Sequence, residues 1–151
     1  MLRERLGEEL KSAMKAQDRR RTTTIRLILA AVKDRDLALH ADSDGRDRIG
    51  DAEIAELLTK MVKQRQEASA TYAGAGRNDL VTQEQDEIAI IREFLPQQLS
   101  EEETRAAVID VIADLNAGGL KDMGRVMAAL KERHAGRMDF ARASAIAKEL
   151  L

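Results

Sequence analysis

EFLPQQLSEEE, residues 93–103, is the stretch that decides how this chain is divided. It holds Pro96, the only proline among 151 residues. Because proline disfavours helical geometry at the residue before it, a helix arriving from upstream should end by Leu95. We therefore expect a domain boundary at this proline, with domains at residues 1–95 and 96–151.

Upstream of the proline, the apolar spacing predicts four amphipathic helices. Leu2, Leu6, Leu10 and Met14 recur at every fourth residue of the first. Asp51 should cap the third helix with its carboxylate. The expected helices cover residues 2 to about 17, about 22 to 39, 51 to about 74 and about 78 to 95, with a solvated, aspartate-rich loop at 40–51.

Downstream of the proline, three short helices are expected. Ser100 and Glu103 have the spacing of a capping box, in which each side chain bonds a backbone amide at a helix start. Gly118 should supply the left-handed turn that ends this helix. Asp122 and Asp139 should cap the next two. Their apolar positions are Val108, Ile112, Leu115, Met123, Val126, Met127, Leu130, Ile146 and Leu150.

The composition indicates the fold class and bears on the cellular compartment. Apolar residues make up 44% of the chain but aromatic residues only 2%, so the core must be aliphatic and the expected class is all-α. The sequence has no cysteine, which excludes disulfides and thiolate metal sites and fits a cytoplasmic setting. It has neither a signal-like apolar stretch at the N-terminus nor an apolar segment of membrane-spanning length. We expect a soluble protein that does not contact membranes.

No pattern in the sequence predicts catalysis, a cofactor or a metal site. His40 and His134 have neither triad partners nor the HExxH spacing, so we expect solvated or capping roles. The aspartates at 42, 44 and 47 lack the glycine position and distal glutamate of a calcium loop. Glu84 and Glu87 lie one turn apart on what should be a wet helix surface, where raised pKa values are not expected.

Gly124 is the glycine that needs a reason, because it lies inside the second of the downstream helices. An interior glycine costs about 0.5–1 kcal/mol relative to alanine. Such a cost usually reflects a close approach to the backbone. Tight packing against a neighbouring helix is one explanation. A nucleic-acid backbone that approaches the exposed amide end of the helix is the other.

Basic residues are the better functional lead, although the net charge is only −2. Residues 117–151 hold seven Lys or Arg against four acids, and residues 1–35 hold ten against five. Acids lie close to each cluster, so solvated faces with internal ion pairs are the competing interpretation. The main candidate site comprises Lys121, Gly124, Arg125, Lys131, Arg133 and Arg137, with Arg142 at its edge. A secondary patch comprises Arg19, Arg20 and Arg21 in the first turn between helices, Arg26 and Lys33 on one helix face, and Lys60 and Lys63, with Arg65 if it points outward.

Four stretches, in order and over almost the whole chain, resemble the GatB/YqeY family of small helical proteins. They are TTTIRLILAAVKDRDL (22–37), KMVKQRQEASATYAGAGRNDL (60–80), QEQDEIAIIREFLPQQLSEEE (83–103) and GGLKDMGRVMAALKERHAGRMD (118–139). The C-terminal part is similar to the tail domain of GatB, a component of the glutamine-dependent aspartyl/glutamyl-tRNA amidotransferase. The matching residues are Gly124, Val126, Met127, Gly136 and Arg137, whereas Met138 and Phe140 depart from a small residue and a proline.

The resemblance implies a helical N-terminal domain and a three-helix tail that grips tRNA without performing chemistry. Small members of the family lack the kinase-like catalytic domain of the amidotransferase. Carbon–nitrogen ligase activity with glutamine as amido donor would therefore be inherited from the larger enzyme and is not expected of this chain. The expected function is a non-catalytic tRNA-binding accessory protein. Aminoacyl-tRNA synthetase or amidotransferase subunits are further candidate partners, and DNA is not expected.

The alternative to RNA binding is a role as a protein-interaction module. The stripe of Met123 and Met127, or the helical N-terminal domain, could dock another protein helix, with the charges serving solubility alone.

If tRNA does bind, one tyrosine and two phenylalanines are too few for base stacking. Recognition would then use phosphates, 2′-hydroxyls and RNA shape.

Overall fold

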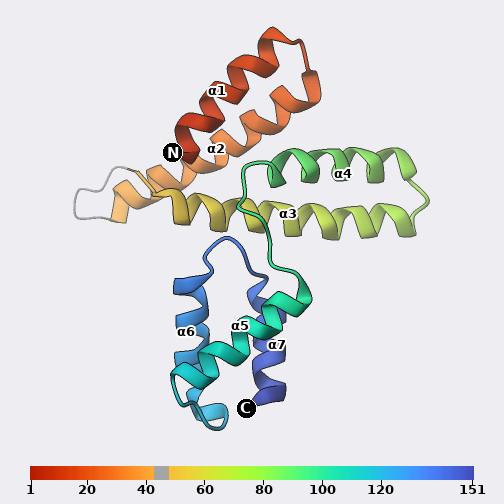
Figure 1. Ribbon diagram of the computed structural model, residues 1–151. Coiled ribbons are helices and arrows are strands. Elements are labelled where there is room, and N and C mark those ends of the chain that lie inside the picture. Colours follow the sequence, from red (N-terminus) through yellow and green to blue (C-terminus); the bar gives the residue numbers. More distant parts are fainter. Residues whose placement is uncertain (43–47) are drawn as a thin grey trace. The chain divides into compact units, whose positions relative to one another are not determined.

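The structure is a computed structural model that describes residues 1–42 and 48–151. Within those ranges the chain forms seven α-helices and one 3₁₀ turn, with no strand (Figure 1). The all-α prediction is confirmed. The chain divides into two compact units, Met1–Leu95 and Pro96–Leu151, each with its own hydrophobic core. Of the helices described, none is long and apolar enough to cross a bilayer.

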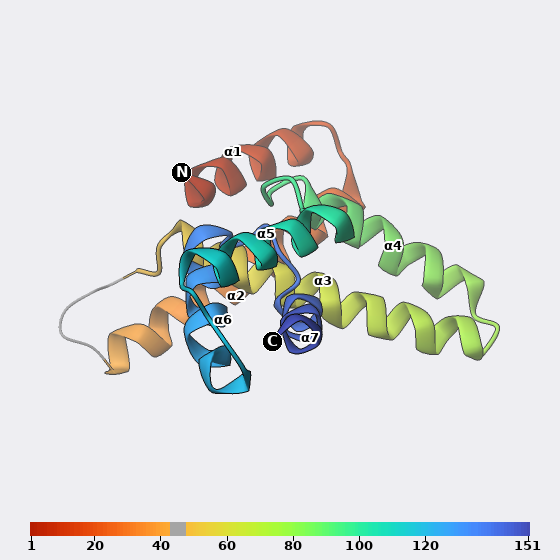
Figure 2. The same ribbon diagram turned by 60° about the horizontal axis from the view of Figure 1, so that its bottom comes forward.

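The N-terminal unit consists of two helical hairpins. One pairs α1 (Leu2–Lys15) with α2 (Arg19–Asp42), and the other pairs α3 (Asp51–Gly74) with α4 (Asn78–Arg92), as Figures 1 and 2 show. Helix α4 also packs on α2. The shared core is almost entirely aliphatic, as its composition requires. Its fully buried large side chains are Leu6, Ile25, Ile28, Val32, Ile54, Leu58, Ile91 and Phe94.

The turn between α1 and α2 is shorter than predicted. Helix α2 begins at Arg19 rather than near residue 22, so the three consecutive arginines form its first turn. Asp18 explains the difference, because its carboxylate accepts the Arg21 amide at 3.1 Å. Gln17, with φ 56°, provides the left-handed residue that ends α1. A cap one residue before the arginines therefore starts the helix early.

The predicted cap of α3 is wrong. Gly50 occupies the N-cap position, and Asp51 is the first helical residue. The Asp51 carboxylate instead accepts the Leu2 amide at 3.2 Å and lies 3.5 Å from the Met1 amine. It caps the start of α1, which folding brings close to the start of α3.

The C-terminal unit contains α5 (Glu101–Asp114), the 3₁₀ turn η1 (Leu120–Asp122), α6 (Met123–Arg133) and α7 (Phe140–Leu150). Helix α5 packs across both α6 and α7, which lie side by side (Figures 1 and 2). The capping box is confirmed, with the Ser100 hydroxyl accepting the Glu103 amide at 3.1 Å and the Glu103 carboxylate accepting the Ser100 amide at 3.0 Å. Asp139 caps α7 as predicted. The buried core comprises Ala107, Val108, Val111, Val126, Leu130, Met138, Ala143, Ile146 and Ala147.

Two details around α6 differ from expectation. The left-handed residues after α5 are Asn116 (φ 49°) and Gly119 (φ 79°), not Gly118. Asp122 makes no side-chain cap for α6, because its carboxylate accepts the Gly118 amide at 2.8 Å. The side chain of Asp122 therefore closes the turn before α6 instead of capping the helix itself.

Met138, which departs from the amidotransferase pattern, is a core residue that is only 1% exposed. The loop that carries it is joined to the segment after Pro96. Leu99 donates its amide to the Arg137 carbonyl at 2.8 Å. The Gln98 side chain donates to the Gly136 carbonyl at 2.6 Å. These bonds fix the start of the C-terminal unit against the loop between α6 and α7.

Candidate nucleic-acid interface

The start of α6 is open at the predicted glycine. A Cβ added to Gly124 would meet no atom of the described chain within 4 Å beyond its own turn and neighbours. The packing explanation for this glycine is therefore wrong, since no neighbouring helix approaches it. Space for a ligand remains above the first turn of α6.

Two cations border this open position. Lys121 is exposed and makes no ion pair within residues 1–42 and 48–151. The Arg125 side chain is 57% exposed, contacts Asp122 at 3.4 Å and donates to the Leu115 carbonyl at 3.3 Å. The Asp122 side chain is only 18% exposed, so this contact offsets part of the Arg125 charge, whereas the charge of Lys121 has no such partner within the described residues.

Asp122 lies between the two cations but is committed to the backbone. Its pKa is lowered first by the hydrogen bond from the Gly118 amide, and then by the charges of Arg125 and Lys121. The carboxylate therefore stays ionised and orients Arg125 next to Gly124. One negative charge between two cations leaves a local excess of positive charge at the start of α6.

The expected row of free amides at this helix start is only partly present. The turn η1 runs directly into α6, and Met123 donates its amide to the Leu120 carbonyl. Asp122 likewise donates its amide to the Gly119 carbonyl at 3.2 Å. Because these amides are already bonded, the side chains of Lys121 and Arg125 would have to carry most of the attraction for an anion.

The other predicted tail residues lie at the opposite end of α6. Eleven residues of α-helix span about 16 Å along the backbone, yet the Arg133 side chain reaches the residue next to Leu115, whose carbonyl accepts from Arg125. Arg133 pairs with Asp114 of α5 at 2.8 Å, and Arg137 donates its Nε hydrogen to the Gln97 carbonyl at 3.1 Å. Lys131 is exposed. Arg142, at the predicted edge, pairs with Glu101. Arg133, Arg137 and Arg142 thus join parts of their own unit.

In the secondary patch, two of the three consecutive arginines form ion pairs within their own unit. Arg20 pairs with Asp86 of α4. Arg21 pairs with Glu9 at 2.9 Å and with Glu93 at 2.6 Å. These two arginines tie the start of α2 to α1 and α4, so the interpretation as internal ion pairs is correct for them.

The remaining residues of the secondary patch are more accessible. Arg19 and Arg26 line a surface pocket at the α1–α2 turn, and Arg26 contacts the Met14 sulfur at 3.8 Å. Lys33 and Lys63 are exposed. Lys60 lines a groove between α2 and α3. Arg65 does not point outward, because it pairs with Glu87 at 3.0 Å.

One expectation about titratable groups was wrong. Glu84 and Glu87 are partly buried rather than on a wet surface, and burial followed by the charge of Glu87 raises the pKa of Glu84. His134 occupies the C-cap position of α6, in keeping with the expected capping role, although it is partly buried and its Nδ1 has no hydrogen-bond partner within the described chain. The side chains of His40 and Asp42, and residues 44 and 47, lie outside the described residues. In the rest of the chain, no three His, Asp or Glu side chains gather where they could hold a metal ion.

Comparison with known proteins places this architecture in a family. Residues 3–151 match the family described as Yqey-like protein. The protein named "Altered inheritance of mitochondria protein 41, mitochondrial" from Lachancea thermotolerans is 34% identical over 112 residues, which cover 73% of this chain and 57% of the relative. Its counterpart from Kluyveromyces lactis is 34% identical over 113 residues, covering 73% and 58%. The chain therefore spans little more than half the length of these relatives.

These names contradict the expected cytoplasmic setting, because they are those of mitochondrial proteins. The expectation failed because a lack of cysteine excludes disulfides without distinguishing one compartment from another. This protein belongs to the YqeY-like family.

Proposed function

We propose that this YqeY-like protein binds structured RNA, and tRNA first, through the start of α6, as a non-catalytic accessory to tRNA-dependent amidation. The observation that carries the proposal is the open space above Gly124 between exposed Lys121 and exposed Arg125. The resemblance of residues 118–139 to the tail domain of the amidotransferase supports tRNA as the RNA. The proposal assigns the chain a gripping role and no chemical step.

The mode of binding follows from the side chains at hand. Lys121 is a mobile point charge, whereas Arg125 presents a planar donor fork held by Asp122 and the Leu115 carbonyl. Gly124 between them lets a sugar–phosphate backbone come closer than any side chain would allow. Phosphate contacts of this kind position RNA by shape and give salt-sensitive binding. A site with two cations should bind with modest affinity.

The test removes both charges at once. Lys121→Ala combined with Arg125→Ala should weaken binding of bulk tRNA about tenfold and reduce the slope of log K against log salt by about 2, one for each phosphate that is no longer neutralised. Anisotropy of fluorescently labelled tRNA, measured over a series of salt concentrations, gives both quantities. Helical circular dichroism should not change, because both side chains are exposed.

The matched control removes two cations from elsewhere in the same unit. Arg105→Ala with Lys148→Ala changes the net charge equally, and Arg105 has its own partner in Glu149. This control should bind tRNA within about twofold of the wild-type chain, since exposed ion pairs contribute little. Equal loss in both double variants would point to unspecific charge, and an unchanged affinity in the first would refute the site.

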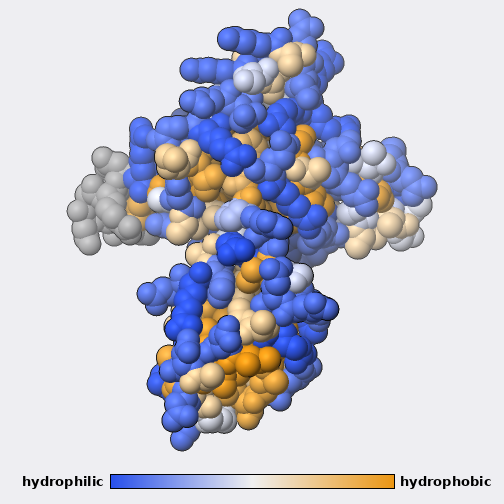
Figure 3. Space-filling view, in the orientation of Figure 1, coloured by the Kyte–Doolittle hydropathy of each residue, from blue (hydrophilic) through white to orange (hydrophobic). Residues whose placement is uncertain are grey.

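A second candidate function is protein docking by the same unit. Apolar surface gathers on the C-terminal unit in the space-filling view (Figure 3), and its exposed large hydrophobic side chains are Ile109, Leu120 and Leu150. The predicted methionine stripe is not free for this purpose, because Met123 and Met127 pack against the core of their own unit. Binding to a nuclease-treated synthetase or amidotransferase subunit, without binding to tRNA, would favour this second function.

A further inference from the structure

Helix α2 is apolar on two faces, and its own unit covers one. Ile25, Ile28 and Val32 are buried in the core. On the other side Leu27 remains 44% exposed, with partly buried Ala31 four residues further on. A helix that is apolar on two faces is normally covered on both. Ala31 packs at the edge of the core of its own unit, whereas nearly half of the Leu27 side chain stays uncovered within the described chain.

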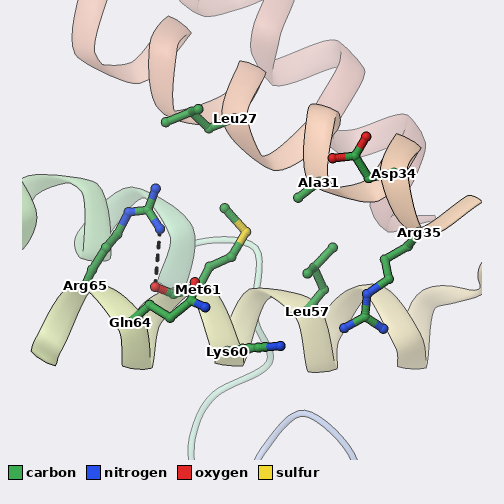
Figure 4. A pocket seen from close by; sticks show the side chains of 9 residues that line it. All are labelled: Leu27, Ala31, Asp34, Arg35, Leu57, Lys60, Met61, Gln64 and Arg65. Atoms are coloured by element: carbon green, nitrogen blue, oxygen red, sulfur yellow. Dashed lines mark hydrogen bonds between the residues drawn. The ribbon is translucent and has the colours of Figure 1, made fainter. Parts of the chain in front are cut away.

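This second face forms one wall of a groove whose other wall is α3. Ala31 points from α2 toward α3, Leu27 lies beside α2, and Leu57 and Met61 rise from α3 across an open space (Figure 4). The groove has a volume of about 420 Å³. On each helix the two apolar residues lie four positions apart and so share one face, and α2 runs obliquely across α3 (Figure 4).

The rim of the groove is predominantly positive. Arg35 and Lys60 line it, and neither makes an ion pair within residues 1–42 and 48–151. Arg65 also lines it but is already compensated by Glu87 at 3.0 Å. Asp34 is the carboxylate among the lining residues. Two uncompensated cations against one carboxylate give the rim an excess of positive charge.

We propose that this groove binds an amphipathic helix of a partner protein, whose aliphatic stripe is flanked by aspartate and glutamate. The stripe would cover Leu27 and the remaining exposed edges of Ala31, Leu57 and Met61, and the flanking carboxylates would meet Arg35 and Lys60. Helix-in-groove recognition of this kind uses anchors at positions i, i+3, i+4 and i+7. The apolar floor favours protein over RNA, because phosphates gain nothing from covering aliphatic side chains. The proposal concerns the N-terminal unit and does not depend on the RNA site at α6.

The probe is a designed helical peptide of about 18 residues, or five turns, with leucines along one face and glutamates on both sides. A second peptide with lysine in place of each glutamate is the matched control. Amide shifts of the isotope-labelled full chain should change for groove residues when the glutamate peptide is added. The affinity for the lysine peptide should be at least about tenfold lower, because its charges face Arg35 and Lys60.

Two substitutions and their controls complete the test. Leu27→Glu and Lys60→Glu should each weaken binding of the glutamate peptide about tenfold. Both positions are accessible, so the fold should persist. Leu37→Glu and Lys11→Glu, which make the same changes at exposed positions outside the groove lining, should leave binding within about twofold.

Three outcomes would overturn the proposal. The glutamate peptide could cause no shifts at groove residues at millimolar concentration, or bind no better than the lysine peptide. Bulk tRNA could shift the same residues with higher affinity than the peptide, which would make the groove an RNA surface. The groove shifts could also depend on protein concentration without peptide, which would make the occupant a second copy of this chain.

Discussion

Phe94→Ala should lower the free energy of unfolding of the N-terminal unit by about 3–5 kcal/mol. Phe94 is 1% exposed and lies in the core just before the Pro96 linker. The Arg5 guanidinium lies 5.1 Å from the centroid of its ring and donates to the Glu93 carbonyl at 2.6 Å. Removal of the ring leaves a cavity and takes away the surface on which Arg5 rests. Domains are stable by about 5–15 kcal/mol, so much of the stability of this unit should be lost.

Hydrogen exchange resolved by residue measures this effect in each unit separately. Protection should fall in α1 to α4 and remain in α5 to α7, because the two units have separate cores. Phe140→Ala is the control, since Phe140 is only partly buried and packs against the C-terminal core. It should reduce protection in the C-terminal unit alone. A loss below about 1 kcal/mol for Phe94→Ala would show that the ring is not a core residue.

Glu87→Ala should destabilise the same unit by about 2–3 kcal/mol, the second largest effect we expect. The side chains of Arg65 and Glu87 are 15% and 13% exposed, and their 3.0 Å contact joins α3 to α4. Without Glu87, the Arg65 guanidinium keeps its 3.3 Å bond to the Met61 carbonyl and a charge interaction with Glu84, but it loses its direct ion pair in a largely desolvated position. The cost comes mainly from leaving one charge buried without its direct partner, and partial exposure keeps it below that of a fully buried pair.

Replacement of both partners tests that reasoning. Arg65→Met with Glu87→Met removes both charges while retaining side-chain volume, and it should cost clearly less than the two single substitutions to alanine together. Urea denaturation followed by helical circular dichroism supplies the free energies. If the double variant is as unstable as the sum of the single variants, the pair does not act as a unit.

The sequence correctly predicted those helix caps that depend on residues close together in the chain. The capping box of Ser100 and the Asp139 cap depend on residues two or three positions apart, and both are present. The prediction for Asp51 fails because its partner, the Leu2 amide, lies 49 residues away. The early start of α2 differs from the prediction although Asp18 precedes it directly, because a run of three arginines is equally compatible with a turn. Local patterns locate helices, whereas contacts between helices decide what a carboxylate caps.

In the candidate site, too, local sequence patterns were predicted whereas contacts between distant residues were not. The sequence identified the basic residues but not which of them are compensated, since the partners of Arg20 and Arg21 on and after α4 lie 66 and 72 residues away. The groove between α2 and α3 was not predicted at all. Its available signal was Leu27, an apolar residue opposite the core face of α2, but only the fold shows that α3 lies across from it. Surface charge can be counted from sequence, whereas its compensation requires coordinates.

The central claim is that RNA comes close to the backbone at Gly124. Gly124→Glu tests it most directly, because the position is open and an acid near the start of a helix is favourable for folding. Ala106→Glu makes the same change in charge on exposed surface of α5 and serves as the control. We expect Gly124→Glu to retain its stability and to bind bulk tRNA about tenfold more weakly than Ala106→Glu, through repulsion of phosphate. Equal tRNA affinities for the two variants would contradict the account.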